Sequence, residues 1–273
     1  MNADFIQNIT NLGLSDAQQL CDGSSVYVEF SGTAATVDLM RPNALQKALV
    51  LSSDLAIYPA AHIIIDDPEP RERAVVTGTR LPFSDLDFRW GHHPGTLTED
   101  TIRRALGLYP SIAEIHVGDS FHRVADALLF YENGYNSQNP DLALIGFTTC
   151  LDGLFSTVEQ EVSFRLSLRL SHFLADENER RREVFDQSRE VYKVRSKIVH
   201  GASIDRNPER AAIYLVENVV PKAERLARRS LQKILTLRLG DLFSRPAAIE
   251  RLFDAVLFSN SLQDALRTLN PRS

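Results

Sequence analysis

An arginine and a histidine stand five residues apart at the end of one predicted helix, in the segment RSKIVHG, as Arg195 and His200. A guanidinium can hold a phosphate and stabilise the charge that develops on it. An imidazole can move a proton near neutral pH, and RNA supplies its own nucleophile, the 2′-hydroxyl group. The two residues lie about 140° apart on a helix, yet they can converge because arginine is long and Gly201 can end the helix. The pair suits RNA cleavage, and we expect no cofactor and no metal site.

Arg195 occupies an unusual place for a charged residue. If Val184 is set at zero and each residue advances the helix by about 100°, Ile198 lies near −40° and Arg195 near 20°, inside the apolar stripe. An arginine there must be paired in the interior or project into an interface or cleft. Asp152 and Glu161, on the preceding helical segment, are candidate partners. An ion pair with either would explain Arg195 without any chemistry.

Other charged residues offer weaker candidates. Arg165 and His172 are seven residues apart and share a helix face, so they form a second arginine–histidine pair. The most basic cluster could contact RNA or a partner, and it consists of Arg225, Arg228 and Arg229, near Lys222 and Lys233.

Composition and charge bound the class of protein. The chain has 273 residues, of which 44% are hydrophobic and 24% charged, which is ordinary for a globular protein with an ample core. A net charge of −6 excludes a strongly basic footprint over the whole chain. The charge is uneven, because residues 1–118 carry 8 Lys/Arg against 15 Asp/Glu, whereas residues 201–240 carry 8 against 4. We expect a polyanionic partner to bind the C-terminal half.

Cysteine usage and hydropathy indicate the compartment. Cys21 and Cys150 are far apart and form neither a disulfide framework nor a metal motif, which fits a reducing environment. The N-terminus lacks the pattern of a signal peptide, and no stretch approaches 18 uninterrupted apolar residues. We expect a cytoplasmic protein without a membrane segment.

The first part of the chain, residues 1–118, has a mixed α/β pattern. We hypothesise that it is a sensing or regulatory region, a role that the pattern itself does not determine. Two pairs of strand-like segments occur there, at 25–30 with 35–40 and at 61–67 with 74–81. A helix over 98–109 begins at Thr98, followed by acidic residues.

The second part, residues 119–273, has helical periodicity throughout, so the predicted fold class is α+β overall, with an all-α bundle after residue 118. Helix-boundary residues mark its elements. We predict helix starts at Asn139–Pro140, Asp176-x-x-Glu179 and Asn207–Pro208, and helix ends at Asn133–Gly134 and Gly201. We also predict a helix break near Ser156-x-x-Glu159 and a kink or restart at Pro221. A last helix is predicted over about 246–269.

Residues from about 141 to 239 resemble the HEPN domain, and in particular its Apea-like branch. The likeness rests on CLDGLFSTVEQEVSFRLSLRLSHFL (150–174), ERRREVFDQSREVYKVRSKIVHG (179–201) and AERLARRSLQKIL (223–235). Its most specific part is the Arg-x-x-x-x-His signature within a Tyr-x-x-Arg-Ser-Lys-Ile-Val-His-Gly helix end.

This resemblance implies an all-α bundle that dimerises through its helices. It also implies metal-independent endoribonuclease activity in a defence, abortive-infection or toxin–antitoxin role, with RNA as substrate and a protein regulator or antitoxin as a further partner. Arg195 and His200 match the family's catalytic pair. The supporting or RNA-contacting candidates are Asp152, Glu161, Arg165, Ser196 and Lys197.

Two other functions compete with the ribonuclease. The first is a catalytically inactive HEPN scaffold that dimerises and binds a partner protein or nucleic acid. A closed ion pair between Arg195 and Asp152 or Glu161 would favour it. The second is a small-molecule-binding module, which would have a well-formed apolar pocket within residues 1–118.

Overall fold

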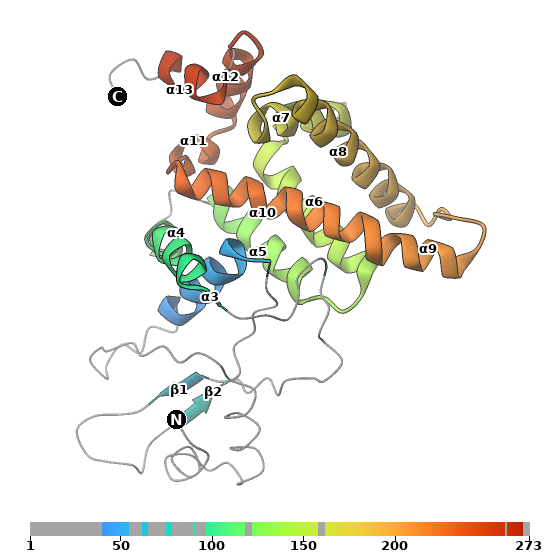
Figure 1. Cartoon of the computed structure of the whole chain (residues 1–273), viewed down its shortest axis with the longest axis horizontal. Helices are drawn as coiled ribbons and strands as arrows, with labels where there is room; N and C mark the ends of the chain where they lie inside the picture. Colours follow the sequence, from blue (N-terminus) through green and yellow to red (C-terminus); the bar gives the residue numbers. More distant parts are fainter. Residues whose placement is uncertain are drawn as a thin grey trace.

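The structure of the chain is a computed structural model (Figure 1) that describes residues 40–54, 62–64, 75–77, 90, 97–117, 122–157, 162–259 and 261–269. Its elements are α3 (Met40–Ser52), β1 (His62–Ile64), β2 (Val75–Thr77), α4 (Glu99–Val117), α5 (His122–Asn136), α6 (Pro140–Phe155), α7 (Val162–Leu174), α8 (Asn178–Val199), α9 (Pro208–Tyr214), the π-helical segment η3 (Leu215–Val219), α10 (Val220–Thr236), α11 (Gly240–Ser244), α12 (Pro246–Leu257) and α13 (Leu262–Leu269).

Two helices, α6 and α10, form the centre of the bundle. Helix α6 is the most apolar of the long helices, and its neighbours are α5, α7, α8 and α10. Helix α10 crosses α6, contacts α3, α4, α5, α7 and α8, and continues the line of α9 and η3 beside α8 (Figure 1). Four phenylalanines, from α6, α7, α11 and α12, meet mainly edge to face at one end of this core: Phe155, Phe173, Phe243 and Phe253. Burial of these apolar side chains is the main force that holds the helices together.

The hairpin of α5 and α6 depends on two facing glycines. A Cβ added to Gly146 would lie 2.7 Å from the backbone Cα and N of Gly134, and 3.0 Å from the carbonyl oxygen of Phe130. Backbone atoms cannot move aside as a flexible side chain can. The sequence predicts that this helix ends at Asn133–Gly134, but α5 continues to Asn136. The close contact at Gly134 explains why a glycine occurs inside the helix.

Replacing Gly146 by alanine should therefore lower the free energy of unfolding by about 1–3 kcal/mol, the usual cost of overpacking. Gly153→Ala, in the same helix, is the matched control, because its added Cβ would meet nothing nearer than the Ala127 Cβ at 3.9 Å. The control should leave stability unchanged or raise it by up to about 1 kcal/mol. Urea unfolding followed by circular dichroism measures both, and equal effects of the two changes would contradict the close approach.

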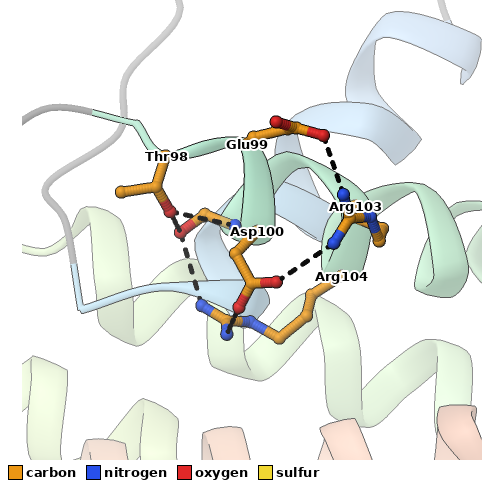
Figure 2. A network of polar contacts seen from close by, with 6 residues as sticks. Thr98, Glu99, Asp100, Arg103 and Arg104 are labelled. Atoms are coloured by element: carbon orange, nitrogen blue, oxygen red, sulfur yellow. Dashed lines mark hydrogen bonds and ion pairs between the residues drawn. The ribbon is translucent and has the colours of Figure 1, made fainter.

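The first turn of α4 is closed by its own side chains (Figure 2). The Thr101 N–H donates to Thr98 Oγ1 over 3.2 Å, which confirms Thr98 as a helix start. Arg103 pairs with Glu99 at 2.7 Å and with Asp100 at 3.4 Å. These exposed pairs each contribute a few tenths of a kcal/mol at most, about 0.3–0.5, so the turn is locally determined.

The predicted α+β class is wrong, because the described part of the chain is an all-α fold. Its strands are β1 and β2, which have three residues each and pair antiparallel within the predicted segments 61–67 and 74–81. Two strands of this length cannot build a layer. Instead α3 and α4, which precede residue 118, pack on α10. The segments 25–30 and 35–40 lie outside the described residues, except for Met40, which begins α3.

Most predicted boundaries of the later helices are confirmed. Asn139 and Asn207 cap α6 and α9, and each is followed by a proline. The predicted helix break near Ser156 is also found, because α6 ends at Phe155 and α7 begins at Val162. Helix α8 begins after Glu177, which makes no side-chain cap bond, rather than at Asp176. The last predicted helix is two helices, α12 and α13. The predicted domain boundary at 118 falls between α4 and α5 and stays a prediction.

Candidate functional site

The carboxyl end of α8 is fixed by a Schellman motif. Gly201 has a φ of +65°, a left-handed conformation that glycine adopts without strain. The Ala202 N–H donates to the carbonyl of Lys197 over 2.7 Å, and the Gly201 N–H donates to that of Ile198 over 3.1 Å. The predicted role of Gly201 as a helix end is confirmed, and His200 is the residue just before it.

A groove with a volume of about 900 Å³ runs along α8 and is also lined by residues of α7, α9 and the α8–α9 loop. Its positively charged lining residues are Arg189, Lys193, Arg195 and Lys197. Glu190 is the one acidic residue among the described side chains that line it. A concave surface with this excess of positive charge attracts anions.

Arg195 lies between the core and this groove. Its Nη2 is 3.7 Å from Oδ2 of Asp152 on α6, and 34% of its side chain is exposed. Its Nε is buried and has no hydrogen-bond partner within the described residues. A guanidinium has five N–H donors, so one distant carboxylate contact leaves most of them unused. An unpaired buried donor costs about 1–3 kcal/mol, so the Nε of Arg195 is an energetically unfavourable feature of this site.

Tyr192, one turn before Arg195, holds Asp152 from the other side. Its hydroxyl donates to Asp152 Oδ1 over 2.9 Å and lies 3.2 Å from the carbonyl oxygen of Thr148. Burial raises the pKa of Asp152, although the Tyr192 hydrogen bond and the Arg195 charge act to lower it. Burial and the nearby Asp152 raise the pKa of Tyr192 well above its ordinary value, so the phenol stays a neutral donor. Its place on the apolar stripe indicated only core packing, so sequence reasoning missed it.

His200 does not line the groove in the single chain. Its side chain is exposed, beside Val199, which is 50% exposed. Within the part of the chain that the structure describes, no hydrogen bond or ion pair involves its imidazole. Arg195 and His200 therefore share a helix end, but Arg195 alone of the two faces the groove.

Two of the other predicted supporting residues, Ser196 and Lys197, line the groove. Ser196 is exposed, and the Lys197 Nζ donates to the Ile204 carbonyl over 3.1 Å. That bond ties the loop after α8 back onto the helix. Glu161 lies outside the described residues. Sequence reasoning also missed Arg189, although its spacing of four from Lys193 on one helix was a usable signal.

Glu190, which lines the groove, links α8 to α9 and α10. Its carboxylate accepts from the Tyr214 hydroxyl and, over 2.8 Å, from the Lys222 Nζ. Burial and this hydrogen bond raise the pKa of Tyr214 to about 12. The π-helical segment η3 lies between Tyr214 and α10, which begins just before Pro221. The backbone stays helical through this junction, so the predicted kink or restart at Pro221 corresponds to a π-helical irregularity and not to a separate helix. Because Lys222 neutralises Glu190, the groove keeps its positive charge.

Arg165 lies away from the groove, in an ion-pair cluster with α12. Its Nη2 is 3.2 Å from Glu250 Oε2, and Arg169 Nη2 is 2.6 Å from the same oxygen. Arg169 also donates to the carbonyl of Phe155 over 2.6 Å, at the carboxyl end of α6. The helix dipole stabilises a cation at this position. Thr157 donates to the Glu250 carboxylate. Arg165 thus serves the packing of α7 on α12.

Glu250 should make stability depend on acidic pH. Burial alone would raise its pKa, but the bonds from Thr157 and Arg169 lower it below the ordinary value. Because the pKa of Glu250 is lowered in the folded state, its contribution to the free energy of unfolding is complete above the pKa of glutamate in the unfolded chain, about 4.3. That contribution is lost as the pH falls through the pKa of the folded state. We expect Glu250→Gln to reduce the loss of stability between pH 5 and pH 3, measured by urea unfolding at each pH. An unchanged slope would show that Glu250 is not a titrating partner of the arginines.

The residues of the predicted basic cluster on α10 have different environments: one forms a buried ion pair, two bind carbonyl groups of α7, and one is exposed and makes no bond of this kind within the described residues. Arg228 is buried and paired with Glu224. Arg229 donates to the carbonyl of Leu174 over 3.3 Å and Lys233 to that of Phe173 over 2.7 Å, so both cap the end of α7. Arg225 is exposed.

Within the described residues, no helix is both long and apolar enough to cross a membrane. Comparisons of the chain with protein-family models, with curated proteins and with solved structures give no match.

Proposed function

We propose that the protein is an endoribonuclease of the HEPN type, with Arg195 and His200 as its catalytic pair. The observation that carries this proposal is the state of Arg195, a guanidinium that borders a basic groove, touches one carboxylate at 3.7 Å and has a buried, unsatisfied Nε. A phosphodiester would supply the missing acceptors and the opposite charge.

In the proposed reaction the 2′-hydroxyl of a ribose gives up its proton and its oxygen attacks the adjacent phosphorus, while the bond from phosphorus to the 5′-oxygen breaks. A 2′,3′-cyclic phosphate forms, and the 5′-oxygen leaves with a proton. Arg195 stabilises the charge on the phosphate, and His200 transfers a proton. Lys193 and Arg189 neutralise neighbouring phosphates.

We further propose that two copies of the chain form the working site, with RNA bound between them and a protein regulator or antitoxin controlling it. Val199, which is 50% exposed beside His200, would be one of the contacts of this interface. A second copy would cover this valine and could bring His200 beside the partner's groove.

A catalytically inactive scaffold is the second candidate. The ion pair between Arg195 and Asp152 favours it, because a structural pair would explain the arginine alone.

Cleavage of total RNA in EDTA distinguishes the two. The ribonuclease should release fragments with cyclic phosphate ends, and His200→Ala should lower the rate by about 10²–10⁴-fold, the usual contribution of acid–base catalysis. His172→Ala, which removes a histidine on α7 that interacts with the charge of Arg181, is the control and should keep its activity. A wild-type protein that binds RNA without cleaving it would establish the scaffold instead.

A further inference from the structure

Three features outside the proposed catalytic pair are candidates for a further role: the arginine-capped end of α7, the buried network around Arg228, and the Tyr192–Asp152 contact beneath the groove. The first two bind backbone carbonyls and carboxylates and contribute no residue to the groove lining. Only the third ends on a residue that lines the groove, Arg195, whose buried Nε has no partner within the described residues.

We infer that Tyr192 is a positioning residue of this site, which acts through Asp152 to aim the Arg195 guanidinium into the groove. This inference rests on the proposed function. The contacts run in one line from the core outward: Thr148 carbonyl, Tyr192 hydroxyl, Asp152 carboxylate and Arg195 Nη2.

The burial of each member fits this role. Tyr192 is 5% exposed, so packing fixes its ring. Asp152 is held at Oδ1 by a 2.9 Å bond and presents Oδ2 to Arg195. A carboxylate anchored at one oxygen has a fixed orientation, and at 3.7 Å it can orient the guanidinium without using its donors. Without a fixed carboxylate beside it, an arginine with many rotamers would sample positions away from the phosphate.

A merely structural pair would behave differently. Tyr192→Phe would then lower stability and leave the chemistry of the folded enzyme unchanged. If Tyr192 positions Arg195, the change should lower kcat by about 10- to 100-fold, the effect of a small misplacement at a reacting group, with KM nearly unchanged because the groove cations remain.

Tyr131→Phe is the matched control. Tyr131 is also buried, 3% exposed, and its hydroxyl donates to a carboxylate, Glu224 Oε1, over 2.7 Å. The same chemical group is removed in both variants, but Tyr131 lies in the α5–α10 contact, not at the groove. Its loss should lower stability while kcat stays within twofold of wild type, about 0.4 kcal/mol in activation free energy.

The experiment measures kcat and KM for RNA cleavage below the unfolding transition of every variant, together with binding of an uncleavable all-deoxy oligonucleotide. Asp152→Asn serves as a second variant should Tyr192→Phe fail to fold, and it should show the same loss of kcat. Cleavage by wild type with an unchanged kcat in Tyr192→Phe or Asp152→Asn, or an equal loss in Tyr131→Phe, would overturn the positioning role alone. An inert wild type would overturn the proposed function and this inference with it.

Discussion

Replacing Arg195 by alanine should lower kcat/KM for RNA cleavage by about 10²–10³-fold, the effect of removing a donor that stabilises transition-state charge. The free energy of unfolding should change much less, because the side chain is 34% exposed and its one carboxylate contact is long. The variant also removes the unsatisfied Nε. Asp152 keeps its bond from Tyr192, and burial already raises its pKa, so it can take up a proton rather than remain an unpaired charge.

Two further variants test whether the effect belongs to Arg195 itself. Arg195→Lys keeps the charge but not the planar fork that binds phosphate, so activity should stay low. Lys193→Ala removes one charge from the same groove at an exposed position. It should weaken binding a few-fold, lower the slope of log K against log salt by about one, and leave kcat unchanged. Single-turnover cleavage and the salt dependence of binding measure these effects. Equal losses in Lys193→Ala and Arg195→Ala would reduce the groove to a general anion-binding surface.

The sequence predicts the helix ends of the bundle well because those signals are local. Asn139 with Pro140 and Asn207 with Pro208 satisfy the first N–H groups of a helix from within the same few residues. Gly201 ends α8 because it can adopt a positive φ. None of these depends on which other helix lies nearby.

The first half of the chain was predicted less well because its helices gain their stability from packing. Helix α3 has almost no amphipathic pattern, and two of its buried residues, Ala44 and Ala48, are small. It lies against α4 and α10 and is held at its carboxyl end by side chains of α10. Ile63 and Ile64, which are β-branched, lie in a strand pair of three residues on each side within the described part of the chain. Tertiary contacts outweigh local propensity here.

The roles of the arginines could not be read from spacing. Arg169, Arg181 and Arg229 bind carbonyl groups at the ends of α6 and α7. Those partners are backbone atoms that any residue carries, so no sequence pattern marks them. The position of Arg195 on an apolar stripe was informative because burial of a charge demands a partner, and the predicted alternative, Asp152, is that partner. Tyr192 could not be identified, because an apolar face accommodates a tyrosine with or without a hydrogen bond.

Replacing Arg228 by methionine should lower the free energy of unfolding by about 3–5 kcal/mol, the cost of breaking a buried ion pair. Arg228 is 9% exposed and Glu224 1%. Nε of the arginine lies 2.9 Å from Glu224 Oε1, and Nη1 donates to the Ser53 carbonyl over 3.0 Å. The variant would remove the cation that balances the buried Glu224 carboxylate and would release the carboxyl end of α3.

Glu224→Gln combined with Arg228→Met tests this reason for the loss. Glutamine is neutral and still offers an oxygen to the Tyr131 hydroxyl, which now donates to Glu224 over 2.7 Å. The double variant should therefore be more stable than Arg228→Met alone by about 1–3 kcal/mol. Arg225→Met, exposed on the same helix, should stay within about 0.5 kcal/mol of wild type. Urea unfolding of the four proteins measures these differences. A double variant no more stable than the single one would show that the lost contact with α3, rather than the loss of the cation beside Glu224, dominates the cost.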